Sequence, residues 1–128
     1  MTVGLHTVNI ANKNLDWLRG VSPGTIAGLH IKLHVGDPGA AGTANPSATT
    51  TRRQATMNAA ASGQITLSAM SGNYAMTASE TISHFSVWDD ATAGNFLFSG
   101  TWTVARVVVN GDTIVVQTFV VSNTPLAA

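Results

Sequence analysis

Hydrophobic and polar residues change their period along this chain of 128 residues. In the segment 7–19 the apolar residues recur at spacings of three, four and three positions, which places them on one stripe of a helix. These residues are Val8, Ala11, Leu15 and Leu18. Gly20 follows, where a helix commonly ends. The pattern therefore predicts a short amphipathic helix that packs on a larger body.

The period becomes two in the segment 29–35, which is typical of a strand. Leu29, Ile31, Leu33 and Val35 fall on one face, and His30, Lys32 and His34 fall on the other. This alternation predicts a half-buried strand whose histidines face solvent or an interface. The sequence Gly36-Asp37-Pro38-Gly39 ends it, and the small residues that follow predict an exposed loop.

The rest of the chain is predicted to be β-structure. Short alternations indicate weak strands at 54–58 and 64–70. Segments rich in β-branched and aromatic residues indicate stronger strands at 81–88, 95–104, 106–109 and 113–121. Asn110-Gly111 predicts a tight hairpin between the last two.

These elements predict a mainly β fold, an antiparallel β-sandwich or barrel-like sheet with one short N-terminal helix. We expect a single domain over 1–128, with a helical arm at 1–24, the sandwich at 25–121 and a C-terminal tail at 122–128.

Charge is scarce and balanced, with six basic and six acidic residues that make up only 9% of the chain. A neutral chain lacks the clustered Lys and Arg that hold a nucleic-acid backbone, so we expect no nucleic-acid partner. The longest apolar runs are too short to span a bilayer, and the first residues do not resemble a signal peptide. Hydrophobic residues reach 45%, which predicts a surface partly covered by neighbouring subunits.

Candidate chemical sites each fail on geometry. On a strand, His30 and His34 would lie about 13 Å apart, too far for one metal ion. Gly36, Gly39 and Gly42 lack the helix that a phosphate loop requires. We therefore expect no metal and no bound cofactor.

The adjacent carboxylates of Asp89 and Asp90 would point to opposite faces of a strand, so they cannot flank one bond. We expect them to bond backbone amides in a turn instead. The chain has no cysteine, and no serine lies in a nucleophile elbow. We therefore predict no catalytic residues and no enzymatic activity. Trp17 and Trp102 are expected in the core or in helix packing.

Arg52 and Arg53 are the only paired arginines. On a strand they would face opposite ways, and on a loop both could reach carboxylates of a partner. Two solvated arginines at a strand start are an equal alternative.

Four stretches of the chain together resemble small virion proteins of tailed bacteriophages of actinobacteria. In order they are "LHIKLHVGDPGAAGTANPS", "RRQATM", "ISHFSVWDDATAGNFLFSGTWT" and "VVVNGDTIVV". The resemblance covers 29–121 and maps Gly36 to Gly39 onto the family's turn, Arg53-Gln54 onto a strand start, and His84 to Asp89 onto its central strand. The sequence "DATAGN" at 90–95 and the C-terminal tail depart from the family pattern.

The resemblance implies an all-β structural protein of the phage particle, made in the host cytoplasm and located in the virion. Members of the family include head decoration, minor tail and fibre-associated proteins. We favour a capsid decoration (cement) protein, because the loop at 37–51 has no aromatic recognition groups. A minor tail or fibre-associated module that contacts the host surface is the alternative.

In the decoration hypothesis the partners are the major capsid protein and copies of the chain itself, as a small symmetric oligomer such as a trimer. We expect the loop to carry contacts, and the N-terminal helix or the C-terminal tail could equally serve as the docking arm. The predicted contact residues are Asp37, Pro38, Arg52, Arg53, Pro125 and Leu126.

Overall fold

A computed structural model describes residues 3–123, and β-strands dominate it. The helical part is a π-helical turn, η1 (Thr7–Ala11), that continues directly into α1 (Asn12–Leu18). The strands are β1 (Leu29–His34), β2 (Arg53–Met57), β3 (Gln64–Met70), β4 (Tyr74–Ala75), β5 (Glu80–Trp88), β6 (Phe96–Val108), β7 (Thr113–Ile114) and β8 (Val120–Ser122).

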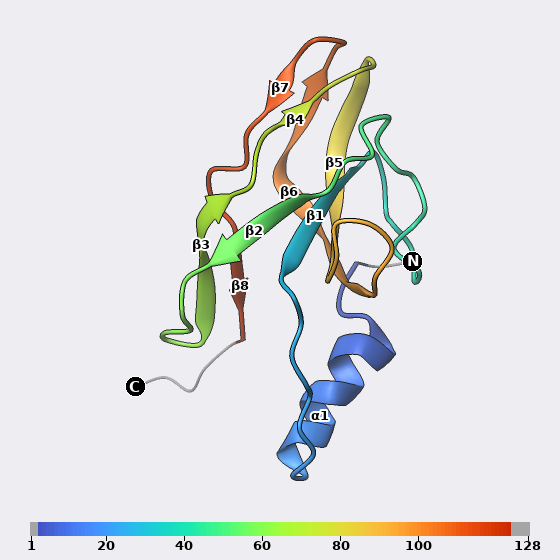
Figure 1. The fold of residues 1–128 in the computed structure, drawn as a ribbon. Coiled ribbons are helices and arrows are strands. Elements are labelled where there is room, and N and C mark those ends of the chain that lie inside the picture. The colour runs from blue at the N-terminus through green and yellow to red at the C-terminus, as the bar shows by residue number, and fades with distance from the viewer. Residues whose placement is uncertain (1–2, 124–128) are drawn as a thin grey trace.

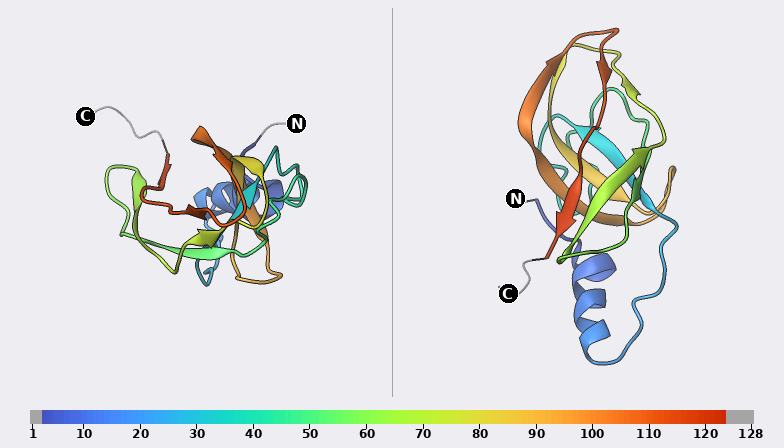
Figure 2. Two further views of the ribbon diagram at one scale, coloured as in Figure 1. Left: turned by 90° about the horizontal axis from the view of Figure 1, so that it is seen from above. Right: turned by 90° about the vertical axis from the view of Figure 1, so that its left-hand side faces the viewer.

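Six strands form one antiparallel sheet in the order β6-β5-β1-β2-β3-β8. The sheet curls until its first and last strands approach each other, so the fold is barrel-like (Figures 1 and 2). β4 and β7 form a separate two-stranded sheet at one end. The prediction of a mainly β, antiparallel fold with one short N-terminal helix is confirmed, in its barrel-like form.

Local irregularities accompany the curl. The pairing of β5 with β6 shifts register between Ile82 and His84, where β6 runs from Arg106 to Thr101, and such an irregularity bends a strand and increases its twist. Gly100 lies opposite Phe85 in the same pair, and a Cβ at Gly100 would lie 2.5 Å from the Phe85 ring. The absent side chain gives the aromatic ring its place on the concave face.

Two neighbouring groups of buried side chains fill the barrel. The first is Ile31, Ala55, Val87, Leu97 and Phe119. The second is Leu33, Tyr74, Met76, Ile82 and Val108. The Tyr74 hydroxyl donates a hydrogen bond to the carbonyl of Ile31 at 2.8 Å, and burial raises the pKa of Tyr74 well above its usual value. This bond joins the two groups.

The prediction that β1 is half-buried is wrong. Ile31 and Leu33 are buried as expected, but His34 is also fully buried and His30 nearly so. The reason is the loop at 36–51, which folds back along the end of β1: the amide of Ser47 donates to the carbonyl of Leu33, and the amide of Val35 donates to the carbonyl of Asn45. The loop is therefore a cover for the sheet, and the prediction that it is simply exposed is also wrong.

The N-terminal helix forms where it was predicted, but the prediction that its apolar stripe packs on a larger body is wrong. Leu15 and Leu18 are exposed, as is Trp17. α1 extends beyond one end of the barrel (Figures 1 and 2). The arm is held instead by residues 4–9, which run along the edge of β6.

The turn at Asn110-Gly111 forms, but the predicted hairpin does not. The amide of Asp112 donates to the carbonyl of Val109, and Gly111 has a φ of 97°, which glycine tolerates. However, β7 pairs with β4 and β8 pairs with β3, so neither pairs with β6. The predicted strands 95–104 and 106–109 are one continuous strand, and the predicted strand 113–121 is two short ones.

Candidate functional site

A buried chain of hydrogen bonds connects β1, β5 and the loop at 36–51. The ring nitrogens of His34 lie 2.7 Å from the carbonyl oxygen of Ala44 (Nδ1) and 2.7 Å from Ser86 Oγ (Nε2). Because a carbonyl only accepts, Nδ1 carries the proton and Nε2 accepts from the Ser86 hydroxyl. Ser86 Oγ in turn accepts from Trp88 Nε1 at 2.8 Å. Every polar group in this chain has a partner, which makes it a structural link.

The strand register also places His84 directly opposite His34. This pair does not form a metal site, because both ring nitrogens of His34 are already engaged. Burial, above all other causes, lowers the pKa of His34. Among residues 3–123 no group of three or more His, Cys, Asp or Glu side chains could hold a metal ion.

The predicted contact residues in the loop have intramolecular roles. The carboxylate of Asp37 accepts from the amide of Gly39 at 2.8 Å, and Pro38 is fully buried. Further along, Ser47 donates to the carboxylate of Glu80, which also accepts from the amide of Ala48. The loop is therefore fixed to the barrel at several points.

Arg52 fastens the turn that follows β5. Its guanidinium lies over the Trp88 ring, 4.1 Å from the centroid, and Nη1 donates to the carbonyls of Asp90 (2.9 Å) and Ala93 (2.6 Å). Arg53 Nε donates to the carbonyl of Asn73 at 3.0 Å. The structure does not bring the two arginines to a common outward site.

The carboxylates beside this turn behave as predicted. Asp89 accepts from the backbone amide of Asn95 at 2.7 Å and from its side-chain amide at 2.9 Å, and the backbone bond is the main cause that lowers the pKa of Asp89. Asp90 accepts from the amide of Thr92 at 3.3 Å. Pro125 and Leu126 lie outside the described residues. Partner binding at all six predicted contact residues stays a prediction.

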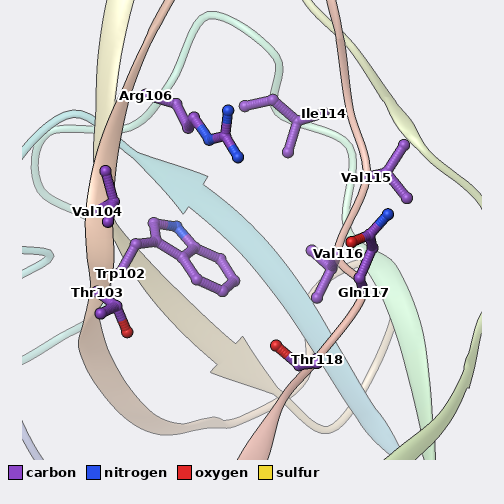
Figure 3. Close-up of a pocket in the computed structure, with 9 residues that line it drawn as sticks. All are labelled: Trp102, Thr103, Val104, Arg106, Ile114, Val115, Val116, Gln117 and Thr118. Atoms are coloured by element: carbon purple, nitrogen blue, oxygen red, sulfur yellow. The ribbon is translucent and has the colours of Figure 1, made fainter.

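A cleft replaces the hairpin that β6 was predicted to form. It lies between β6 and the segment 113–120, and its middle part has a volume of about 290 Å³. In Figure 3 the ring of Trp102 extends from β6 toward Val116. Val104 is 69% exposed although it lines the cleft, and Trp102 Nε1 is buried without a hydrogen-bond partner in the described part of the chain.

The N-terminal arm is anchored at the other half of β6. The amide of His6 donates to the carbonyl of Leu97 at 2.8 Å, and the amide of Ser99 donates to the carbonyl of Gly4 at 2.9 Å. Asn9 Nδ2 donates to the carbonyl of Phe96 at 2.8 Å. These bonds fix the base of the arm, while the apolar side chains of α1 remain outside.

A family model described as "Podophage GP4 fiber I protein gp80" matches residues 5–124. The chain belongs to this GP4 fibre I family. No curated protein matches the sequence.

Membership of the GP4 fibre I family makes the chain a phage virion structural protein. The class that the sequence resemblance implied is thereby confirmed, whereas the actinobacterial host and the decoration role stay predictions. No helix in the described part of the chain is long and apolar enough to cross a membrane.

Sequence reasoning missed the cleft and the outward stripe of the arm. The cleft carried no signal, because the turn residues at 110–111 and the strands beside them fit a hairpin equally well. The stripe did carry one: its strict spacing of three and four is narrower than the broad apolar face of a helix that packs on a globular core.

Proposed function

We propose that the chain is a structural subunit of a fibre of the phage particle. The single observation that carries this proposal is the match to the fibre I family over 5–124, which spans the arm, the barrel and β8. A match of that extent relates the complete described architecture to the fibre protein.

The geometry agrees with a structural role. The loop at 36–51 is fixed to the barrel by the bonds of Glu80 and His34, and the turn after β5 is fixed by Arg52. Such bonds hold surface segments in one conformation. The exposed apolar arm, by contrast, suits attachment to a neighbouring subunit. We propose that the protein acts by binding and not by catalysis, without cofactor or metal.

Copy number and position in the particle test this function. Virions of the phage that encodes the chain would be purified, and the chain would be quantified by mass spectrometry against the major capsid protein. Gold-labelled antibody against the barrel would then locate it by electron microscopy. We expect a small number of copies per particle and label on the fibres.

Other results would overturn the fibre role. A copy number near a simple fraction of that of the capsid protein, with label over the head, would identify a capsid decoration protein that binds the major capsid protein. Absence from purified particles would contradict any place in the finished virion.

A further inference from the structure

The large side chains of the helical arm's apolar stripe face away from its own protein, while Ala11 is partly buried. We call Val8, Ala11, Leu15 and Leu18 the arm stripe. Val8 is 61% exposed, Leu15 63% and Leu18 75%. The arm's own contacts with the barrel come from Gly4, His6, Asn9 and Ile10, none of which belongs to the stripe.

The opposite side of the helix is the one turned toward the body. A cavity of about 180 Å³ separates the helix from the return segment at 23–26, and Lys13 and Asn14 line it together with Ile26. α1 thus presents Lys13 and Asn14 to its own chain and leucines to solvent, while Ile10 of η1 packs against the core. In a monomer, a surface helix normally turns its apolar face to the core and its polar face to solvent, which is the opposite orientation.

Two physical arguments require a cover for the arm stripe. An isolated helix shorter than about 12 residues is marginal in water, and α1 has seven residues. The accessible surface of the protein is 7725 Å², whereas a compact monomer of this mass exposes about 6400 Å². The excess, roughly 1300 Å², belongs to the whole chain and leaves room for the roughly 800 Å² that one partner buries in a standard interface.

The spacing of the arm stripe identifies what covers it. Alternating steps of three and four are the a and d positions of a heptad, the pattern by which helices of a coiled coil pack on one another. Because η1 is π-helical, Val8 is rotated relative to α1, and Leu15 and Leu18 form the centre of the contact.

The residues that flank the arm stripe suit contact between identical helices. Copies related by symmetry bring equivalent residues together, so like charges beside the seam would repel. Asn12 occupies a flanking position and is uncharged, as is Asn14, which lies between the seam and the side turned toward the body. Arg19, also beside the seam, is paired with Asp16 at 2.8 Å, and Lys13 lies on the far side. We propose that the arm stripe packs against the arm stripes of other copies of this chain.

The test is the mass of the full chain in solution. Wild type is measured by sedimentation velocity over a concentration series, beside a double variant Leu15→Glu/Leu18→Glu and a control Trp17→Glu. Trp17 is as exposed as Leu15 and lies on the same helix but off the stripe. We expect wild type and the Trp17 variant to reach a multiple of 13.2 kDa, and the double variant to need at least about a tenfold higher concentration.

Unchanged strand content by circular dichroism would show that the double variant is folded. A mass of 13.2 kDa for wild type at every concentration would overturn the proposal. An equal loss in the Trp17 variant would also overturn it, because the contact would then lie elsewhere on the arm. If the wild type is monomeric but the double variant disappears from virions, the stripe binds a different virion protein and self-association is wrong.

A second measurement does not depend on charge at the seam. The chain has no cysteine, so Leu15→Cys and Leu18→Cys each introduce the only thiol. Under mild oxidation, alone or mixed, we expect disulfide-linked pairs, because residues across a helical seam come within the Cα separation of about 4.4–6.8 Å that a disulfide needs. Trp17→Cys should remain unlinked. Linkage no greater than that of the Trp17 variant would contradict the proposed contact.

Discussion

The loop at 36–51 and the arm at 7–19 differ from expectation in opposite directions. The loop was expected to be exposed and packs on the sheet, whereas the arm was expected to pack and is exposed. The loop consists mainly of small residues, which predicts an exposed segment, yet Pro38 and Ser47 are both fully buried. The arm carries leucines at helical spacing and reads as packed, yet Leu15 and Leu18 are exposed. Both segments are adjacent to the same barrel, so the difference lies in what each one bonds to.

Backbone hydrogen bonds explain the contrast. The loop lies against the end of β1, where backbone amides and carbonyls need hydrogen-bond partners. Because its side chains are small, the loop backbone comes close enough to β1 to form these bonds. α1 satisfies most of its backbone internally and offers the barrel only side chains. A stretch without apolar pattern can therefore cover a sheet, while a patterned helix leaves its stripe for another molecule.

The largest expected contrast is between two leucines. Leu33→Ala should lower the free energy of unfolding by about 2–5 kcal/mol, because it leaves a cavity in the barrel core beside Tyr74 and Ile82. Leu15→Ala should change it by no more than about 0.5 kcal/mol in the monomer. Urea unfolding at a protein concentration that keeps the chain monomeric measures both. Similar losses would mean that the arm packs on its own barrel.

Gly42 tests how closely the loop docks. It has a φ of 73°, and a Cβ there would lie 2.5 Å from the Phe96 ring. Gly42→Ala should cost about 3 kcal/mol of unfolding free energy, from backbone strain and overpacking together. Gly111→Ala is the matched control, because its φ is 97° but its surroundings are open, so only strain remains. Thermal melts with equal losses would show that the loop does not press on Phe96.

Ser86 tests the link between loop and sheet. Ser86→Ala removes the partner of both His34 Nε2 and Trp88 Nε1, and buried groups without partners cost about 1–3 kcal/mol each. We expect a loss of about 2 kcal/mol by chemical denaturation. Ser68→Ala, at an exposed strand position, should stay within about 0.5 kcal/mol. If Ser86→Ala leaves the stability unchanged, the hydrogen-bond chain does not anchor the loop.

The pH dependence of stability should report on His34 with the smallest effect. Its pKa is lowered in the fold, so below 6.5 the unfolded chain takes up a proton that the folded chain does not. Above pH 6.5 the His34 ring is neutral in both the folded and the unfolded state, so its protonation does not change the free energy of unfolding. Stability should therefore fall as the pH drops from 6.5 toward the lowered pKa, by at most about 1.4 kcal/mol per pH unit.

Unfolding titrations at several pH values, compared with a His34→Gln variant, measure this slope. In the variant, the part of the slope that comes from protonation of His34 should disappear. Identical slopes would place the pH dependence on other groups.

Much of the local structure could be read from the sequence. The strands at 29–34, 53–57, 64–70 and 80–88 follow predicted segments closely, and the helix begins and ends near its predicted bounds. The carboxylates of Asp89 and Asp90 bond the turn amides, as their position after a strand indicated. These features depend on neighbours in sequence, which a single chain displays directly.

Side-chain partners across the fold could not be read in this way. The sequence left open whether the paired arginines reach a partner or are simply solvated, whereas Arg52 binds the turn after β5 and Arg53 binds the carbonyl of Asn73. His34 looked solvent-facing because nothing in the sequence shows that the loop returns over β1. Each outcome depends on segments that lie far apart along the chain.

The sequence by itself determined the mainly β class, the positions of most strands, the N-terminal helix and the stripe along it, because periodicity and turn residues act over a few positions. Tertiary structure alone decided that the sheet curls, that the last strands pair with β3 and β4 instead of β6, and that the loop covers the end of β1 while the leucines of the stripe are exposed. Several pairings satisfy the same pattern of residues. The physical choice among them is made by which backbone groups and apolar surfaces meet when the whole chain folds.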